Sequence, residues 1–249
     1  MEENENIHDK LQELFGNDSG SFNILQRQID VDLQVKYFDL SRKVKQELNP
    51  GNVLDESNKL FDDKITEEEK KELLAKLASI EDVKAFRIIE EFYADAPDDL
   101  VEWTALAYQE SRMLIESRLL DQNQVLISTG LGGKGEKLRY FVVLLGRTDK
   151  YLTDVQKKVI KSEFHYILNK HNSEIEDLNF LESMATIKAV IPMKEPVKAV
   201  FEEALVECNN YGNFLKDNFI ITNVKELSFN EIKDFLNNRD YIIQDPEDE

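Results

Sequence analysis

The sequence has almost no cysteine, since Cys208 is the only one among 249 residues, and a single cysteine cannot form an internal disulfide. Long apolar runs are missing as well, and none approaches the roughly 18 residues that a membrane-spanning helix needs. The first residues are acidic, which excludes the basic start of a secretory or transit peptide. Together these absences predict a cytoplasmic protein that makes no membrane contact.

Signatures of metal binding and catalysis are also missing. The only histidines are His8, His165 and His171, and their spacing, with no cysteine nearby, does not match a zinc site. No serine lies in a Gly-x-Ser-x-Gly turn. Cys208 falls on an apolar helical stripe, which is typical of a small core residue. We therefore expect no metal and no cofactor, and the pattern favours a non-enzymatic protein.

Charge of one sign dominates the chain, with 50 acidic residues against 31 basic ones and a net charge of −19. A field of that sign repels nucleic acid and anionic membranes, which argues against nucleic acid as a partner. The excess is uneven, because residues 1–120 carry a net −13 whereas residues 131–170 carry nine bases against four acids. This basic island is either a solvated face docked on the acidic amino-terminal half or a contact surface.

Helical periodicity runs through the first 120 residues. Apolar residues spaced along 7–15 form an amphipathic segment, through which a homo-oligomer could assemble. A capping box at Thr66–Glu69 predicts a helix start, and a second one at Ser228–Glu231 predicts another near the end of the chain. We expect an acidic arm over 1–21, a helical region over 22–120, an α+β domain over 121–244 and a frayed acidic tail over 245–249.

Residues 74–120 resemble a HEAT-type helical hairpin. The resemblance rests on two apolar stripes and the turn between them, in the order Ile80, Val83, Ala85, Ile88, Ile89, then Ala94-Asp95-Ala96-Pro97, then Leu100, Trp103 and Ala105-Leu106-Ala107. Families of this type are generally scaffolds that present a concave face to partner proteins. An ordinary helical bundle explains the same stripes, and under either interpretation Trp103 is expected to be a core anchor.

Extended patterns replace helical ones after residue 122. Strands are predicted over 124–129, 138–145, 185–191 and 219–224, with a small edge strand over 241–243. Helices are predicted between them, one of them capped at Thr153-Asp154 and another beginning near Pro196. The continuous apolar run at 140–145 is typical of a central strand covered on both faces. This order, ββαβαβα after a helical region, predicts an α+β fold with a mostly antiparallel or mixed four-stranded sheet.

A glycine-rich basic loop, Thr129–Lys137, lies between the first two predicted strands. A nucleotide phosphate loop is excluded, because a strand and not a helix follows it. Clustered glycines allow close backbone approach and anion-binding nests, although a plain hairpin connection also uses glycine. The residues expected to bind an anion or a partner are Gly130, Gly132, Gly133, Lys134, Gly135, Lys137 and Arg139.

These patterns favour an interaction or regulatory protein that uses the glycine-rich loop as a contact surface. The expected partner is a protein that presents an acidic or phosphorylated group. The alternative is a domain that binds or processes a phosphorylated small molecule. The sequence does not identify that partner or ligand.

Overall fold

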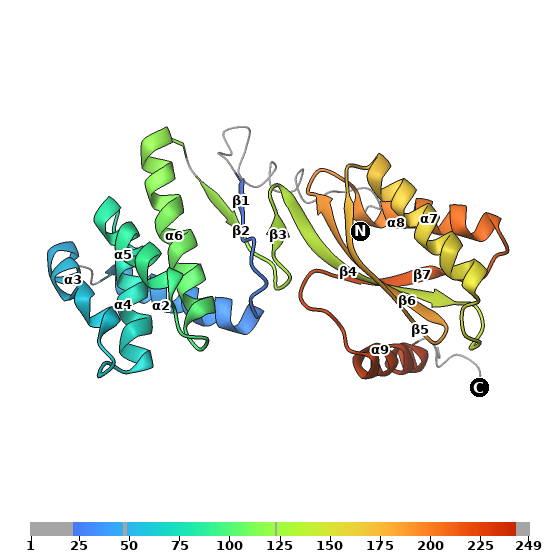
Figure 1. Ribbon diagram of the computed structural model, residues 1–249, viewed down its shortest axis with the longest axis horizontal. Helices are drawn as coiled ribbons and strands as arrows, with labels where there is room; N and C mark the ends of the chain where they lie inside the picture. Colours follow the sequence, from blue (N-terminus) through green and yellow to red (C-terminus); the bar gives the residue numbers. More distant parts are fainter. Residues whose placement is uncertain (1–21, 47–48, 123, 243–249) are drawn as a thin grey trace.

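The computed structural model describes residues 22–46, 49–122 and 124–242. The amphipathic segment at 7–15 and the acidic tail at 245–249 lie outside these residues. Helices α2 to α6 gather at one end of the molecule and a curled sheet with three helices forms the other (Figure 1). None of the helices in the described residues is long and apolar enough to cross a membrane.

The helical end consists of short helices packed around a shared apolar core. Its elements are α2 (Val31–Gln46), α3 (Pro50–Glu56), the 3-10 helix η1 (Ser57–Phe61), α4 (Glu67–Ala78), α5 (Val83–Ala94) and α6 (Val101–Leu120). The capping box predicted at Thr66 and Glu69 is present at the start of α4. Trp103 is buried, as expected, and its indole N–H donates to the carbonyl of Lys71 at 3.0 Å.

One partly buried polar cluster ties α2 to α6. The carboxylate of Glu110 accepts from the Tyr37 hydroxyl at 2.6 Å, from the Ser41 hydroxyl at 2.7 Å and from the Lys45 ammonium at 2.6 Å. Tyr37 is fully buried, and burial, then the neighbouring Glu110 charge, raises its pKa well above the usual value. Because a carboxylate with three donors is well satisfied, this cluster stabilises the packing of the two helices.

Two short strands lie between the helical end and the sheet (Figure 1). β1 (Phe22–Ile24) precedes α2 and pairs in parallel with β2 (Val125–Ile127), which follows α6. Backbone contacts extend this pairing, since Leu25 N–H donates to the Ile127 carbonyl at 2.9 Å and Ile29 N–H to the Gly130 carbonyl at 3.1 Å. The strand predicted over 124–129 therefore exists, but it belongs to this separate pair and not to the main sheet.

All pairings of the main sheet are antiparallel. Its central strand is β4 (Lys137–Gly146), which pairs with β6 (Met184–Pro192) along one side, and with β3 (Gly133–Lys134) and β7 (Leu215–Thr222) along the other. The predicted α+β class is correct. Of the two kinds of sheet that the sequence left open, antiparallel and mixed, the main sheet is antiparallel.

An edge strand was missing from the sequence expectation. β5 (Glu174–Leu181) pairs with β6, yet its sequence EIEDLNFL does not alternate cleanly between polar and apolar residues. The structure explains this, because the register shifts between Ile175 and Asp177, and an extra residue in a strand disturbs the period of two. The edge strand predicted over 241–243 is wrong for Tyr241 and Ile242, which lie inside α9 (Phe229–Ile242), and residue 243 lies outside the described residues.

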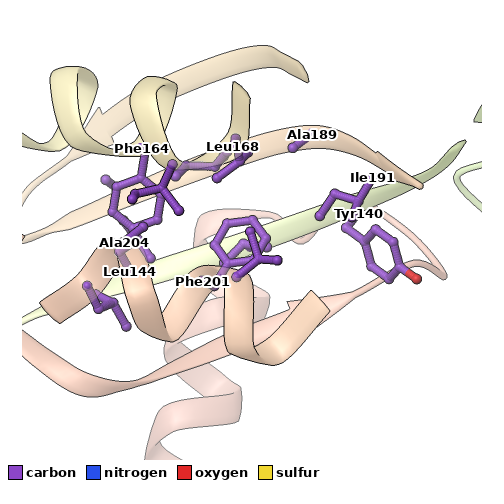
Figure 2. Packing of buried hydrophobic residues seen from close by; sticks show 14 of the residues in the cluster. Tyr140, Leu144, Phe164, Leu168, Ala189, Ile191, Phe201 and Ala204 are labelled. Carbon is purple, nitrogen blue, oxygen red and sulfur yellow. The ribbon is translucent and has the colours of Figure 1, made fainter. Parts of the chain in front are cut away.

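Helices cover both faces of the sheet. α7 (Asp154–Lys170) and α8 (Val197–Asn210) pack on one face, where Phe164 and Phe201 contact the inward side chains of β4 and β6 (Figure 2). α9 covers part of the other face, against Val143 and Ile220. The capping boxes at Thr153 and Ser228 begin α7 and α9. This double cover explains the continuous apolar run of β4.

Strand order places this domain among the split βαβ folds. The chain runs β4-α7-β5-β6-α8-β7, and the strands lie in the order β7-β4-β6-β5. That is the ferredoxin-like arrangement. Such folds carry many unrelated activities, so the fold alone does not define a function.

Candidate functional site

The glycine-rich loop joins the two ends of the molecule. It leaves β2 beside the helical end, passes through Thr129–Gly132 and becomes the short hairpin of β3 and β4. Its first half is buried and its tip, from Lys134 to Glu136, is exposed. The expected hairpin is therefore limited to residues 133–138, and the part before it is a packed junction.

Close backbone contacts account for the glycines of the buried half. A Cβ atom at Gly130 would lie 1.7 Å from the carbonyl oxygen of Val224. At Gly132, where φ is +66°, it would lie 2.5 Å from the carbonyl oxygen of Arg27, and at Gly133 it would lie 2.3 Å from that of Lys137. A side chain does not fit at such distances, so the backbone packing is sufficient to require glycine at these three positions.

The hairpin tip is different. A Cβ atom at Gly135 would meet nothing within 4 Å, although its φ is +62°. Its N–H donates to the side-chain oxygen of Gln26 at 2.7 Å, and the Gln26 amide donates back to the Gly135 carbonyl at 3.2 Å. Gln26 thereby ties the tip to the segment that leads into α2.

Several amides of the loop already have partners. Leu131 N–H donates to the Asn223 carbonyl at 3.0 Å, Gly132 N–H to the Thr129 carbonyl at 3.1 Å and Gly135 N–H to Gln26. An anion-binding nest needs consecutive free amides. The means of holding an anion here are therefore side chains, and the cationic ones gather at the hairpin.

Three cations from the hairpin meet two carboxylates of β5. Lys134 and Lys137 both bind Glu174, at 2.7 and 2.8 Å. Arg139 binds Glu176 through two N–H groups at 2.5 and 2.9 Å, and it also donates to the Leu131 carbonyl at 2.7 Å. We call these five charged residues the hairpin cluster.

The hairpin cluster shifts the titration of its carboxylates. Hydrogen bonds from Lys134 and then Lys137 lower the pKa of Glu174 to about 2. The Arg139 hydrogen bonds lower the pKa of Glu176. Both acids are therefore ionised at neutral pH, and the cluster holds three positive charges against two negative ones. The Lys134 side chain is 60% exposed and that of Arg139 only 16%, so Lys134 is the cation most open to an incoming group.

The acidic half of the hairpin cluster was missed at the sequence level. Glu174 and Glu176 lie on β5, the strand whose irregular pattern gave no clear signal. A bulge in β5 separates Ile175 from Asp177, which shifts the alternation beyond it. The cationic half was found because the basic excess of residues 131–170 is visible without any structure.

Other reactive groups are occupied or buried. Cys208 is fully buried, and burial, then the charges of Glu163 and Glu207, raises its pKa to about 12. His171 contacts Glu195 at 2.7 Å and Glu203 at 3.0 Å through its two ring nitrogens. Burial lowers the His171 pKa, but the hydrogen bonds with these two carboxylates outweigh it and the net pKa is raised. In the part of the chain that the structure describes, no three His, Cys, Asp or Glu side chains are grouped to hold a metal ion.

Comparison with known proteins yields partial likenesses of fold. No protein-family profile and no curated protein matches the sequence. A protein assigned as a transposase of Deinococcus radiodurans is 16% identical, covers 43% of this chain and 94% of its own, and gives a TM-score of 0.36. A REP-associated tyrosine transposase bound to a REP hairpin is 14% identical to this chain. The match covers 43% of this chain and 66% of the transposase, and its TM-score is 0.32.

A third solved structure covers more of the chain. A carboxy-terminal segment of the alpha subunit of aIF2 from Pyrococcus abyssi is 15% identical, covers 78% of this chain and 98% of its own, and gives a TM-score of 0.25. All three scores are below 0.5, so these likenesses carry no inference about function.

Proposed function

We propose that this chain is an interaction or regulatory protein that binds an acidic or phosphorylated group of a protein partner at the hairpin cluster. The observation that carries the proposal is the convergence of Lys134 and Lys137 on one exposed carboxylate, Glu174. Each lysine ammonium has three N–H donors, so two lysines that share one monovalent carboxylate keep donors that are not used by it. An incoming anion can use those donors.

Binding would proceed by exchange of acceptors. A phosphoryl group carries nearly two negative charges and three acceptor oxygens, so it can engage Lys134 and Lys137 together where Glu174 offers two oxygens. Arg139 remains held by Glu176 and by the Leu131 carbonyl, which keeps the base of the hairpin in place. The packed glycine junction beneath limits the movement of the tip, which reduces the entropy lost on binding.

The test measures the anisotropy of a labelled phosphoserine peptide with the full chain, with the unphosphorylated peptide as reference. Lys134→Ala with Lys137→Ala should weaken binding about tenfold or more, since each charge-assisted hydrogen bond contributes about 1.5–3 kcal/mol. Glu174→Gln should tighten it, because the competing carboxylate is gone. Lys64→Ala with Lys84→Ala is the matched control, as both of these lysines are exposed on the helical end.

Equal affinity of the wild type and the Lys134→Ala, Lys137→Ala variant would reject the hairpin cluster as the contact surface. The alternative, a domain that binds or processes a phosphorylated small molecule, is tested by a thermal-shift screen with nucleotides, sugar phosphates and polyphosphate. A ligand that binds the folded chain raises its melting temperature. Stabilisation by one of these small molecules, lost in the same variant, would assign the cluster to a phosphorylated small molecule.

A further inference from the structure

The second half of the basic island lies on α7, at a different place from the hairpin cluster. The exposed side of α7 and of the loop before it carries Lys150, Lys158 and Lys161 together with Tyr151, Val155 and Tyr166. We call these six residues the α7 face. The opposite side of the helix carries the buried Ile160, Phe164 and Ile167, which belong to the apolar core beneath the helix; Figure 2 shows Phe164 pointing toward the sheet.

The lysines of the α7 face differ from the other cations of the island in having no counter-ion among the described residues. Lys134, Lys137, Arg139, Arg147 and Lys170 each contact a carboxylate within 3 Å. Lys157, on the side of α7 next to the α7 face, lies 3.9 Å from Asp154. Among the described residues, by contrast, no carboxylate pairs with Lys150, Lys158 or Lys161.

The acidic helical end does not supply the missing counter-charge. In Figure 1, α7 lies on the outer side of the sheet, and helices α2 to α6 lie at the opposite end of the molecule. Docking on the described part of the acidic half, helices α2 to α6, therefore does not account for the charge of these three lysines. Their charge remains available in a chain whose net charge is −19.

Exposed apolar side chains accompany these lysines on α7 and the loop before it. Tyr151 is 73% exposed, Val155 71% and Tyr166 68%. Val155, Lys158 and Tyr166 occupy helical positions i, i+3 and i+11, which fall within one sector of the helix surface. Tyrosine is enriched in surfaces that bind other proteins.

We propose that the α7 face is a docking surface for an acidic segment of a partner protein that also carries apolar side chains. Charge complementarity selects the acidic segment, because three unpaired ammonium groups face solvent. Val155 offers an aliphatic contact for an apolar peptide side chain, whereas Tyr151 and Tyr166 can pack against a peptide or stack on a base. A long polyanion also meets the field of the whole acidic chain.

The test uses the full chain and three labelled probes. These are a 16-residue peptide of alternating glutamate and leucine, the same peptide with glutamine in place of glutamate, and a 16-nucleotide polyuridine. We expect the glutamate peptide to bind, and Lys158→Glu with Lys161→Glu to weaken it at least tenfold, equivalent to about 1.4 kcal/mol. Tyr166→Ser should weaken both peptides, because it removes apolar contact area.

Matched controls make the result specific. Lys64→Glu with Lys84→Glu changes the net charge by the same amount on the helical end and should leave affinity within about twofold. Equal weakening by this control would overturn the proposal, because binding would then follow net charge alone. Lys134→Glu with Lys137→Glu is the same charge change at the hairpin cluster, and if it weakened the glutamate peptide more than Lys158→Glu with Lys161→Glu did, the peptide would be assigned to the hairpin cluster and the proposal would be overturned.

Two further outcomes would overturn the assignment of the partner. Tighter binding of polyuridine than of the glutamate peptide would assign the face to nucleic acid. A mass above that of the monomer in light scattering, falling to the monomer mass in Lys158→Glu with Lys161→Glu, would assign the face to a second copy of this chain.

Discussion

Replacing Gly130 by alanine should destabilise the junction between the two ends of the molecule. The added Cβ would lie 1.7 Å from the carbonyl oxygen of Val224 and 3.1 Å from a methyl carbon of Val31. Because backbone cannot rotate away as a flexible side chain can, the segment at 223–224 must move. That movement strains the hydrogen bond from Leu131 N–H to the Asn223 carbonyl, which measures 3.0 Å.

The magnitude follows from two contributions. Overpacking of a closely packed site costs about 1–3 kcal/mol, and a lost backbone hydrogen bond costs about 0.5–1.5 kcal/mol. Lower entropy of the unfolded alanine variant offsets about 0.4–1 kcal/mol. The free energy of unfolding should therefore fall by about 0.5–4 kcal/mol, and the melting temperature by roughly 1–16 °C for a chain of this size.

Urea denaturation and thermal unfolding of three alanine variants provide the measurement. Gly135→Ala lies in the same loop, but its added Cβ would meet open space, so only the backbone φ of +62° opposes the change. The free energy of unfolding should therefore fall by about 1–2 kcal/mol. Gly51→Ala lies in the first turn of α3 with its nearest atom at 3.8 Å and should be neutral or slightly stabilising. If Gly130→Ala matched Gly51→Ala, the packing explanation for the buried glycines would be refuted.

Three other substitutions test the packing and charge arguments. Tyr37→Phe removes one of the hydrogen bonds to Glu110 and should lower the free energy of unfolding in urea by about 1.5–3 kcal/mol; no loss would show that the remaining donors satisfy the carboxylate. Phe201→Ala opens a cavity in a fully buried site and should cost about 3–5 kcal/mol, measured as a lower melting temperature; a small loss would indicate that the core relaxes. His171→Gln should cost most at low pH: the folded pKa of His171 is raised, so its contribution is present below pH about 6.5 and is lost as pH rises through the raised value. Urea midpoints of wild type and variant at pH 5.5 and 9 check this, and an equal difference at both values would contradict it.

Local sequence signals predicted much of this fold. The capping boxes at Thr66 and Ser228 are both formed, because the groups that make them lie only three residues apart. The run at 140–145 correctly indicated a central strand, since cover on both faces leaves a continuous apolar pattern. Such signals depend on neighbours in the chain, and one sequence contains all the information they need.

Pairing over long distances was not predictable in the same way. β2 resembles any short apolar strand, and its partner β1 lies about a hundred residues earlier. The glycines at 130, 132 and 133 suggested a ligand loop, whereas the atoms that require them are carbonyls of Val224, Arg27 and Lys137. Two of these carbonyls come from distant segments, so the packing role of Gly130 and Gly132 could not be separated from a ligand role before the fold was known.

The basic island shows why a sum of charges along a sequence does not define a surface. Folding brings Glu174 and Glu176 of β5 against Lys134, Lys137 and Arg139, although 35 or more residues separate each acid from its partners. The lysines of the α7 face receive no such partner within the described chain.

The α7 face and the hairpin cluster should therefore respond differently to salt. At the α7 face the cations are exposed and unpaired, so affinity for an acidic peptide should fall steeply as ionic strength rises. At the hairpin cluster, salt also weakens the internal pairs with Glu174 that an incoming phosphoryl group must displace, so affinity should fall less. Equal salt slopes at the two surfaces would mean that internal pairing does not govern access to the hairpin lysines.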